Sequence, residues 1–161
     1  MNSGPRTVII FAIALLLGVE LLPAQARDTL THDDLTIRGL GENGDTAMTR
    51  RLPGAPLRVV RHDERNEDGA LLVDWYYHDV AISFDEGRPY FMEVTGRTVA
   101  TSRGVRVGDP RAKVRTAYGR PMHEDASYLL YANEAETRGI IFFLTGDRVT
   151  RILVGHVISL E

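Results

Sequence analysis

The chain contains no cysteine, and this absence removes several kinds of structure and chemistry. Disulfide bonds, thiol nucleophiles and thiolate metal ligands are all excluded. Lipoprotein processing, which needs a cysteine after an apolar leader, is excluded as well. A domain made from this sequence must therefore be held together by its hydrophobic core alone.

A large net charge is also missing. The sequence has 19 Lys and Arg against 22 Asp and Glu, a formal net charge of −3, and no tract of basic residues. Nucleic acids and anionic lipid surfaces attract basic patches. We therefore expect neither of them as a partner.

The common catalytic motifs are absent too. No serine lies in Gly-x-Ser-x-Gly, and neither His-Glu-x-x-His nor a phosphate-binding loop occurs. We expect a protein that is not an enzyme, with no catalytic residues and no cofactor.

Several histidines keep an alternative open, which is a metal-assisted periplasmic hydrolase or a metal-binding protein. Histidine and carboxylate side chains are common zinc ligands. Four histidines stand directly before an acidic residue: His32-Asp33, His62-Asp63, His78-Asp79 and His123-Glu124. Adjacent residues on a strand point to opposite faces and do not ligate one ion, so no metal ligands are assigned.

Residues 1–26 have the pattern of a secretory signal peptide. A short polar start precedes an apolar run over residues 7–22, and Ala24-Gln25-Ala26 provides the small-x-small pattern that signal peptidase accepts. The run is shorter than the ~20 apolar residues of a membrane-spanning helix, and it contains Glu20. We expect cleavage before Arg27, no membrane span afterwards, and a periplasmic or secreted protein. Retention of the leader as an anchor is the alternative.

The remaining chain shows a faint internal repeat. Gly54-Ala55-Pro56 matches Gly119-Arg120-Pro121, and a group of apolar residues and glycines recurs later in the same order. That group is Ile82, Phe84, Gly87, Val94 and Gly96 in the first copy and Ile141, Phe143, Gly146, Leu153 and Gly155 in the second. We interpret the repeat as two tandem units, residues 27–100 and 101–161. Chance similarity between two halves of one class is the alternative.

Each unit is predicted to be a short helix followed by antiparallel strands. In the second unit Asp109-Pro110 indicates a helix start and Gly119 its end, and in the first unit Asp45 precedes a weaker candidate over residues 46–52. β-Branched and aromatic residues predict strands over residues 57–62, 71–77, 80–84, 89–95, 128–132, 139–145 and 148–158. The expected fold class is α+β, with two helix-plus-meander units forming one sheet and short helices packed on one face.

The segment 101–121 carries a resemblance to a known family. The pattern Gly-φ-x-φ-Gly-Asp at residues 104–109, a short helix, and Tyr-Gly-x-Pro at residues 118–121 resemble the SmpA/OmlA (BamE-like) envelope lipoproteins. A tandem pair of such units is similar to β-lactamase inhibitor protein. The resemblance implies a protein that presents a surface to another protein and has no enzymatic activity.

One strand candidate is apolar on both faces. In the run 140–144, burial of Ile141 and Phe143 leaves Ile140, Phe142 and Leu144 on the other face. Burying each large side chain is worth about 1.5–3 kcal/mol, so the second face is expected either to be covered by the chain itself or to bind a partner.

Aromatic residues dominate the energetics of many protein interfaces, and they lead to a predicted binding surface. The predicted partner-binding residues are Trp75, Tyr76, Tyr128, Ile140, Phe142 and Leu144. The sequence thus predicts a non-enzymatic protein-binding module, envelope-associated or inhibitor-like. Its expected partner is another envelope or secreted protein.

Overall fold

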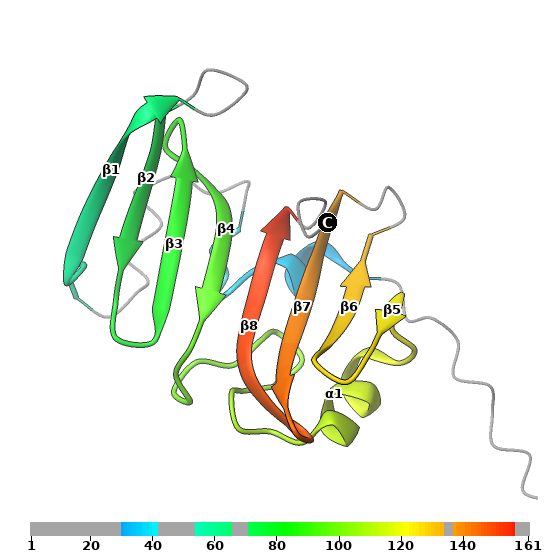
Figure 1. Ribbon diagram of the computed structural model, residues 1–161. Helices are drawn as coiled ribbons and strands as arrows, with labels where there is room; N and C mark the ends of the chain where they lie inside the picture. Colours follow the sequence, from blue (N-terminus) through cyan, green and yellow to red (C-terminus); the bar gives the residue numbers. More distant parts are fainter. Residues whose placement is uncertain (1–29, 42–53, 66–70, 134–136, 157–161) are drawn as a thin grey trace, which may run out of the picture.

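The computed structural model describes residues 30–41, 54–65, 71–133 and 137–156, and these form one antiparallel sheet (Figure 1). Its strands are β1 (Arg58–Arg65), β2 (Leu71–Tyr76), β3 (Val80–Asp85), β4 (Arg88–Val94), β5 (His123–Glu124), β6 (Tyr128–Ala132), β7 (Arg138–Thr145) and β8 (Arg148–His156). Their order in the sheet is β1-β2-β3-β4-β8-β7-β6-β5. Each half of the chain is therefore a meander, and the two meanders meet where β4 pairs with β8.

Helices are few in the described part of the chain. It contains one α-helix, α1 (Arg111–Tyr118), and one short 3-10 helix, η1 (His32–Leu35). The expected α+β class, with short helices from both units packed on one face, is wrong, because the described residues form an eight-stranded antiparallel sheet with a single α-helix. The protein is mostly β. The helix expected over residues 46–52 and the predicted signal peptide lie outside the described residues.

The helix α1 forms where the sequence predicts it, but it begins differently. Gly119 ends the helix with φ 71°, and its N–H donates to the carbonyl of Arg115 at 2.8 Å. Asp109 is not its cap. The Asp109 carboxylate instead accepts hydrogen bonds from the backbone N–H of Arg106 and from Nζ of Lys113, both at 2.7 Å. Asp109 therefore stabilises the turn before the helix.

One hydrophobic core lies between the sheet and the segments that cover one of its faces. Tyr118 of α1 is fully buried, and its ring centroid lies 5.2 Å from that of Phe142 and 5.4 Å from that of Tyr131. Ile37 and Leu40 cover the same face from the N-terminal side. The strands contribute Val80, Ile82, Phe84, Met92, Val94, Leu129, Tyr131, Ile140, Phe142, Leu144, Val149, Ile152 and Val154. Both meanders thus share a single core.

A buried ion pair between Asp34 and Arg103 joins η1 to the loop before α1. Asp34 is 2% exposed and accepts hydrogen bonds from Nε and Nη2 of Arg103 at 2.8 and 2.7 Å. Ser102 Oγ and the backbone N–H of Thr31 also donate to the carboxylate, each at 2.8 Å. The Arg103 guanidinium donates in addition to the carbonyl of Ala117 at 3.0 Å. One carboxylate and one guanidinium therefore link η1, the loop before α1, and α1 itself.

Candidate functional site

The sheet has a second face, opposite the core, which we call the open face. Strand pairing places a row of side chains across it, and cross-strand partners point to the same face. From β1 to β5 the row is Arg58, Tyr76, Ala81, Glu93, Leu153, Ile141, Leu130 and His123. The described helices α1 and η1 both lie on the core side (Figure 1). Neither of them covers this row.

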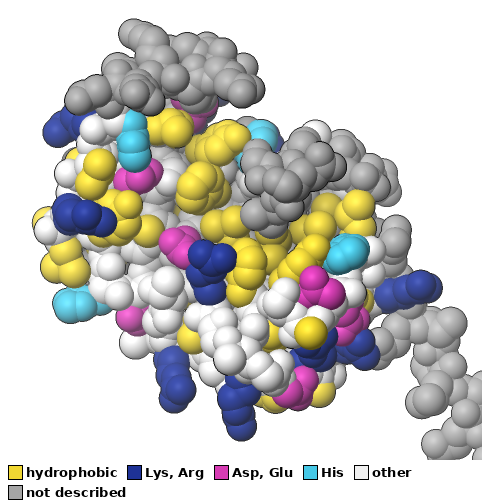
Figure 2. Space-filling view, in the orientation of Figure 1, with side chains coloured by type: hydrophobic (Ala, Val, Ile, Leu, Met, Phe, Trp, Pro, Cys, Tyr) yellow, Lys and Arg dark blue, Asp and Glu magenta, His cyan; other side chains and the backbone are white. Residues whose placement is uncertain are grey.

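The centre of the open face is apolar. Leu153, Ile141 and Leu130 are direct neighbours on β8, β7 and β6, and Phe143 pairs with Tyr128 in the next row. Ile141 is 0% exposed, whereas the other four side chains are partly exposed. Figure 2 shows hydrophobic side chains gathered over this part of the sheet. Water-facing sides of antiparallel sheets are usually polar, so this surface is unusual.

Arginine side chains lie on aromatic rings at this face. The guanidinium carbon of Arg151 is 3.9 Å from the ring centroid of Phe143, and its Nη1 is 3.1 Å from Oε1 of Glu93. Arg58 lies over the ring of Tyr76 at the same distance, 3.9 Å. Such cation–π contacts position a guanidinium group at a surface. Arginine and aromatic residues are also the types that contribute most at protein interfaces.

The structure brings only part of the predicted binding surface together. Tyr76 and Tyr128 both lie on the open face, but Tyr128 belongs to its apolar centre, whereas Tyr76 lies on β2 in the other meander. Trp75 lies on the core face, partly buried, with its ring centroid 5.1 Å from that of Phe84.

The two faces of β7 are exchanged relative to the expectation, in which Ile141 and Phe143 face the core. Ile140, Phe142 and Leu144 are 0%, 0% and 7% exposed and belong to the core, while Ile141 and Phe143 point to the open face. Of the two alternatives given for these three residues, the structure has the one in which the chain itself covers them. Both faces of β7 are apolar, and the contact of Phe142 with α1 decides which face is inside.

Sequence reasoning missed most of the open face, including Leu130, Phe143, Arg151 and Leu153. Only one local signal pointed there. Arg151 is a charged residue directly before the apolar run of residues 152–154, and such a residue marks the solvent side of a strand.

A serine, an aspartate and a histidine also meet on the open face, near β1. Ser83 Oγ donates to Oδ1 of Asp74 at 2.6 Å, and Nε2 of His62 lies 2.8 Å from Oδ2 of Asp74. In a hydrolytic triad the histidine stands between serine and aspartate, because the imidazole takes the hydroxyl proton. Here the carboxylate is in the middle. This cluster therefore lacks the order of a hydrolytic triad, and its hydrogen bonds link β1, β2 and β3.

The histidines are dispersed across the described residues. No three His, Asp or Glu side chains among those residues lie close enough together to hold a metal ion. His62 is paired with Asp74, and His123 stacks on Tyr128 with ring centroids 5.3 Å apart. The acidic neighbours noted in the sequence therefore do not converge on a metal site in this part of the chain.

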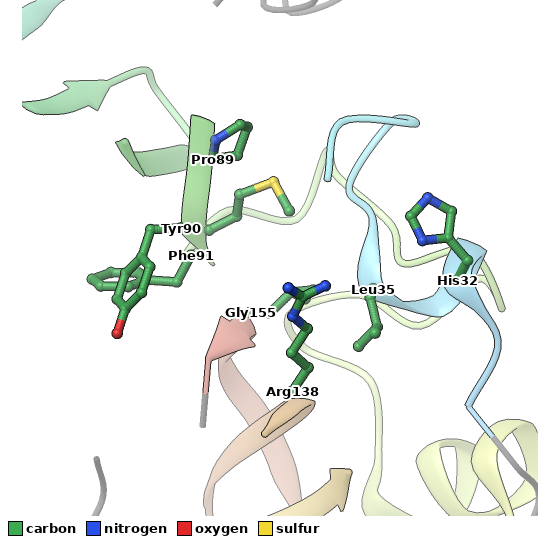
Figure 3. A pocket seen from close by; sticks show the side chains of 9 residues that line it. His32, Leu35, Pro89, Tyr90, Phe91, Arg138 and Gly155 are labelled. Atoms are coloured by element: carbon green, nitrogen blue, oxygen red, sulfur yellow. The ribbon is translucent and has the colours of Figure 1, made fainter. Parts of the chain in front are cut away.

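Two hollows lie between elements. The smaller has a volume of about 20 Å³ and lies between η1, the start of β4 and Arg138 (Figure 3). That is room for about one water molecule. The larger has a volume of about 140 Å³ and lies at the turn between β2 and β3, beside Arg38 and Val99.

None of the described helices is both long and apolar enough to cross a membrane.

Comparisons with known proteins add little to this geometry. No family model and no curated protein matches the chain. Among solved structures, the uncharacterized protein yfeY from Escherichia coli is similar, with 15% sequence identity and a TM-score of 0.48. The match covers 76% of this chain and 97% of that chain. These comparisons do not link the chain to the SmpA/OmlA proteins or to β-lactamase inhibitor protein, and that resemblance stays a prediction.

Proposed function

We propose that this protein is a non-enzymatic protein-binding domain of the periplasm or the secreted fraction, and that the open face is its binding surface. The observation that carries the proposal is the apolar row of Leu153, Ile141 and Leu130, which neither described helix covers. Contiguous apolar patches with polar rims are typical of protein interaction sites. The leader pattern in residues 1–26 supports the location.

The surroundings of this row favour a protein partner over a small molecule. The face is a broad, nearly continuous sheet surface, and neither hollow described above lies at its centre. Arg151 and Glu93 offer both signs of charge beside the apolar row. A partner that buries Leu153 and satisfies these charges fits the usual anatomy of an interface, with an apolar centre and a polar rim.

The test is capture of a partner from envelope extract with tagged residues 27–161 as bait. Leu153→Glu places a charge in the apolar row and is expected to abolish capture. Leu57→Glu is the matched control, because Leu57 is 64% exposed at the start of the first meander, outside the row. A specific protein retained by the parent and by Leu57→Glu, but not by Leu153→Glu, supports the proposal.

A second variant keeps the test valid if the first one does not fold. If Leu153→Glu loses its thermal unfolding transition, Arg151→Ala replaces it, because Arg151 is exposed and its removal leaves the core intact. Loss of an interface arginine commonly weakens binding by roughly tenfold or more. Equal capture by the parent and by a folded open-face variant would contradict the proposal. So would the capture of no protein by the parent.

A further inference from the structure

A two-residue hairpin tip, Arg38 and Gly39, lies on the core side of the sheet. The N–H of Ile37 donates to the carbonyl of Leu40, and the N–H of Leu40 donates back to the carbonyl of Ile37, both at 2.9 Å. Between them, Arg38 and Gly39 have φ angles of 55° and 75°, as a type I′ turn requires. Glycine, asparagine and aspartate suit the first of these positions. Arginine does not, so its presence calls for a reason.

The side chain of Arg38 supplies that reason, because it lines the cavity of about 140 Å³. Val80 and Val99, which are 5% and 3% exposed, form an apolar wall of this cavity. His78 and Thr98 are exposed lining residues and give it a polar rim. An apolar hollow with a few polar groups is the usual form of a small-molecule site.

The charges around the cavity show what a ligand would meet. Asp79 also lines it, but its carboxylate accepts a hydrogen bond from the Thr98 hydroxyl and packs against Gly96, where an added Cβ would fall 1.9 Å from Cγ of Asp79. Among the described residues, no acidic side chain forms an ion pair with Arg38. The carboxylate of Asp79 is thus engaged, and Arg38 is an exposed residue of the cavity lining.

We propose that this cavity binds a small monocarboxylate with a short apolar body. Arg38 binds the carboxylate through paired N–H groups, the geometry in which a guanidinium recognises this anion best. Val80 and Val99 contact the apolar part. The lining contains one guanidinium and also the carboxylate of Asp79, and this balance of charge favours a ligand with a single negative charge over a phosphate. A disfavoured backbone conformation that persists at a binding group is a common mark of a functional site.

The test uses calorimetric titration of residues 27–161 with monocarboxylates of increasing size, from acetate to hexanoate and benzoate, and with the corresponding primary amides. We expect an acid to bind and its neutral amide not to bind. Arg38→Asn is expected to weaken binding by about tenfold or more, since it removes a charge-assisted hydrogen bond. The same variant is expected to raise the melting temperature, because asparagine tolerates positive φ.

A matched control is present in the same chain. Glu86 is the other described non-glycine residue with positive φ, 48°, and it lies in the exposed turn between β3 and β4. Glu86→Asn is expected to raise the melting temperature in the same way and to leave acid binding unchanged. Failure of every acid to bind at millimolar concentration would overturn the proposal. Equal binding of an acid and its amide, or unchanged binding by Arg38→Asn, would overturn it as well.

Discussion

At the scale of single residues, Asp34 shows how hydrogen bonds keep a buried carboxylate charged. Burial alone raises the pKa of a carboxyl group. In Asp34 the hydrogen bonds from Arg103, from the backbone of Thr31 and from Ser102 outweigh burial, and they lower the pKa from 3.8 to about 2. The folded state therefore holds Asp34 ionised more strongly than the unfolded state does.

This difference predicts a specific acid sensitivity. A carboxylate with a lowered folded-state pKa stabilises the fold above pH 3.8, and the contribution is lost as the pH falls through about 2. The shift corresponds to about 2 kcal/mol. In urea titrations, the free-energy difference between the parent and Asp34→Asn should be largest near neutral pH and should shrink by about this amount in strong acid. A difference that does not change with pH would show that Asp34 does not carry the effect.

The identity of Gly155 has a steric reason. Its φ is 138°, and an added Cβ would lie 2.5 Å from the carbonyl oxygen of Tyr90 on β4. The absence of a side chain lets β8 approach β4 where the two meanders join. Beside it, Tyr90 stacks on His156 with ring centroids 4.6 Å apart.

Gly155→Ala should lower the free energy of unfolding for two reasons, the positive φ and the clash of the new Cβ with the carbonyl oxygen of Tyr90. We therefore expect a larger loss than the positive φ alone would cause. Gly146→Ala is the control, since Gly146 also has positive φ, 60°, but its Cβ would meet nothing within 4 Å. The control should lower the free energy of unfolding by roughly 1–2 kcal/mol. Gly155→Ala should lower it by clearly more. Chemical denaturation of the two variants measures both values. Equal losses would mean that the contact with Tyr90 has no energetic weight.

At the scale of elements, local chemistry was enough to predict most boundaries. The strand expected over residues 128–132 coincides with β6, and the one expected over residues 139–145 nearly coincides with β7. The helix between Pro110 and Gly119 is confirmed as α1. Turn residues, β-branched runs and a helix-ending glycine act within a few residues of one another, so a single sequence reveals them.

Which face of each strand points to the core was harder to predict from the sequence. Alternation fixes the inner face of a strand only when one face is polar, and β7 is apolar on both. Its orientation depends on the contact of Phe142 with Tyr118, which comes from a different part of the chain. The open face was therefore predicted only through Tyr76 and Tyr128. The rest of it, and the cavity at Arg38, follow from pairing between distant segments.

At the scale of the whole molecule, the two meanders depend on each other. They share one core cluster, and β4 and β8 are each other's neighbours in the middle of the sheet. Separating the halves would expose both the core and two strand edges. The predicted units 27–100 and 101–161 each contain one meander, and their origin by duplication stays a prediction.

This dependence predicts a single unfolding transition for residues 27–161. The sequence has one tryptophan, Trp75, whose fluorescence reports on the first meander, while far-ultraviolet circular dichroism reports on both. The two midpoints should coincide, as two-state unfolding requires. The separate fragments 27–100 and 101–161 should show no cooperative transition. Distinct midpoints, or a fragment that melts cooperatively, would instead identify two independent domains.

The pairing of β4 with β8 has a consequence for biosynthesis. Ribosomes deliver a chain from its N-terminus, and β8 is the last of the described strands. The edge of β4 that lies at the centre of the finished sheet therefore has no native neighbour until β8 has been synthesised. An unpaired strand edge readily joins strands of other chains. The nascent chain, rather than the finished protein, is thus the form most prone to mispairing.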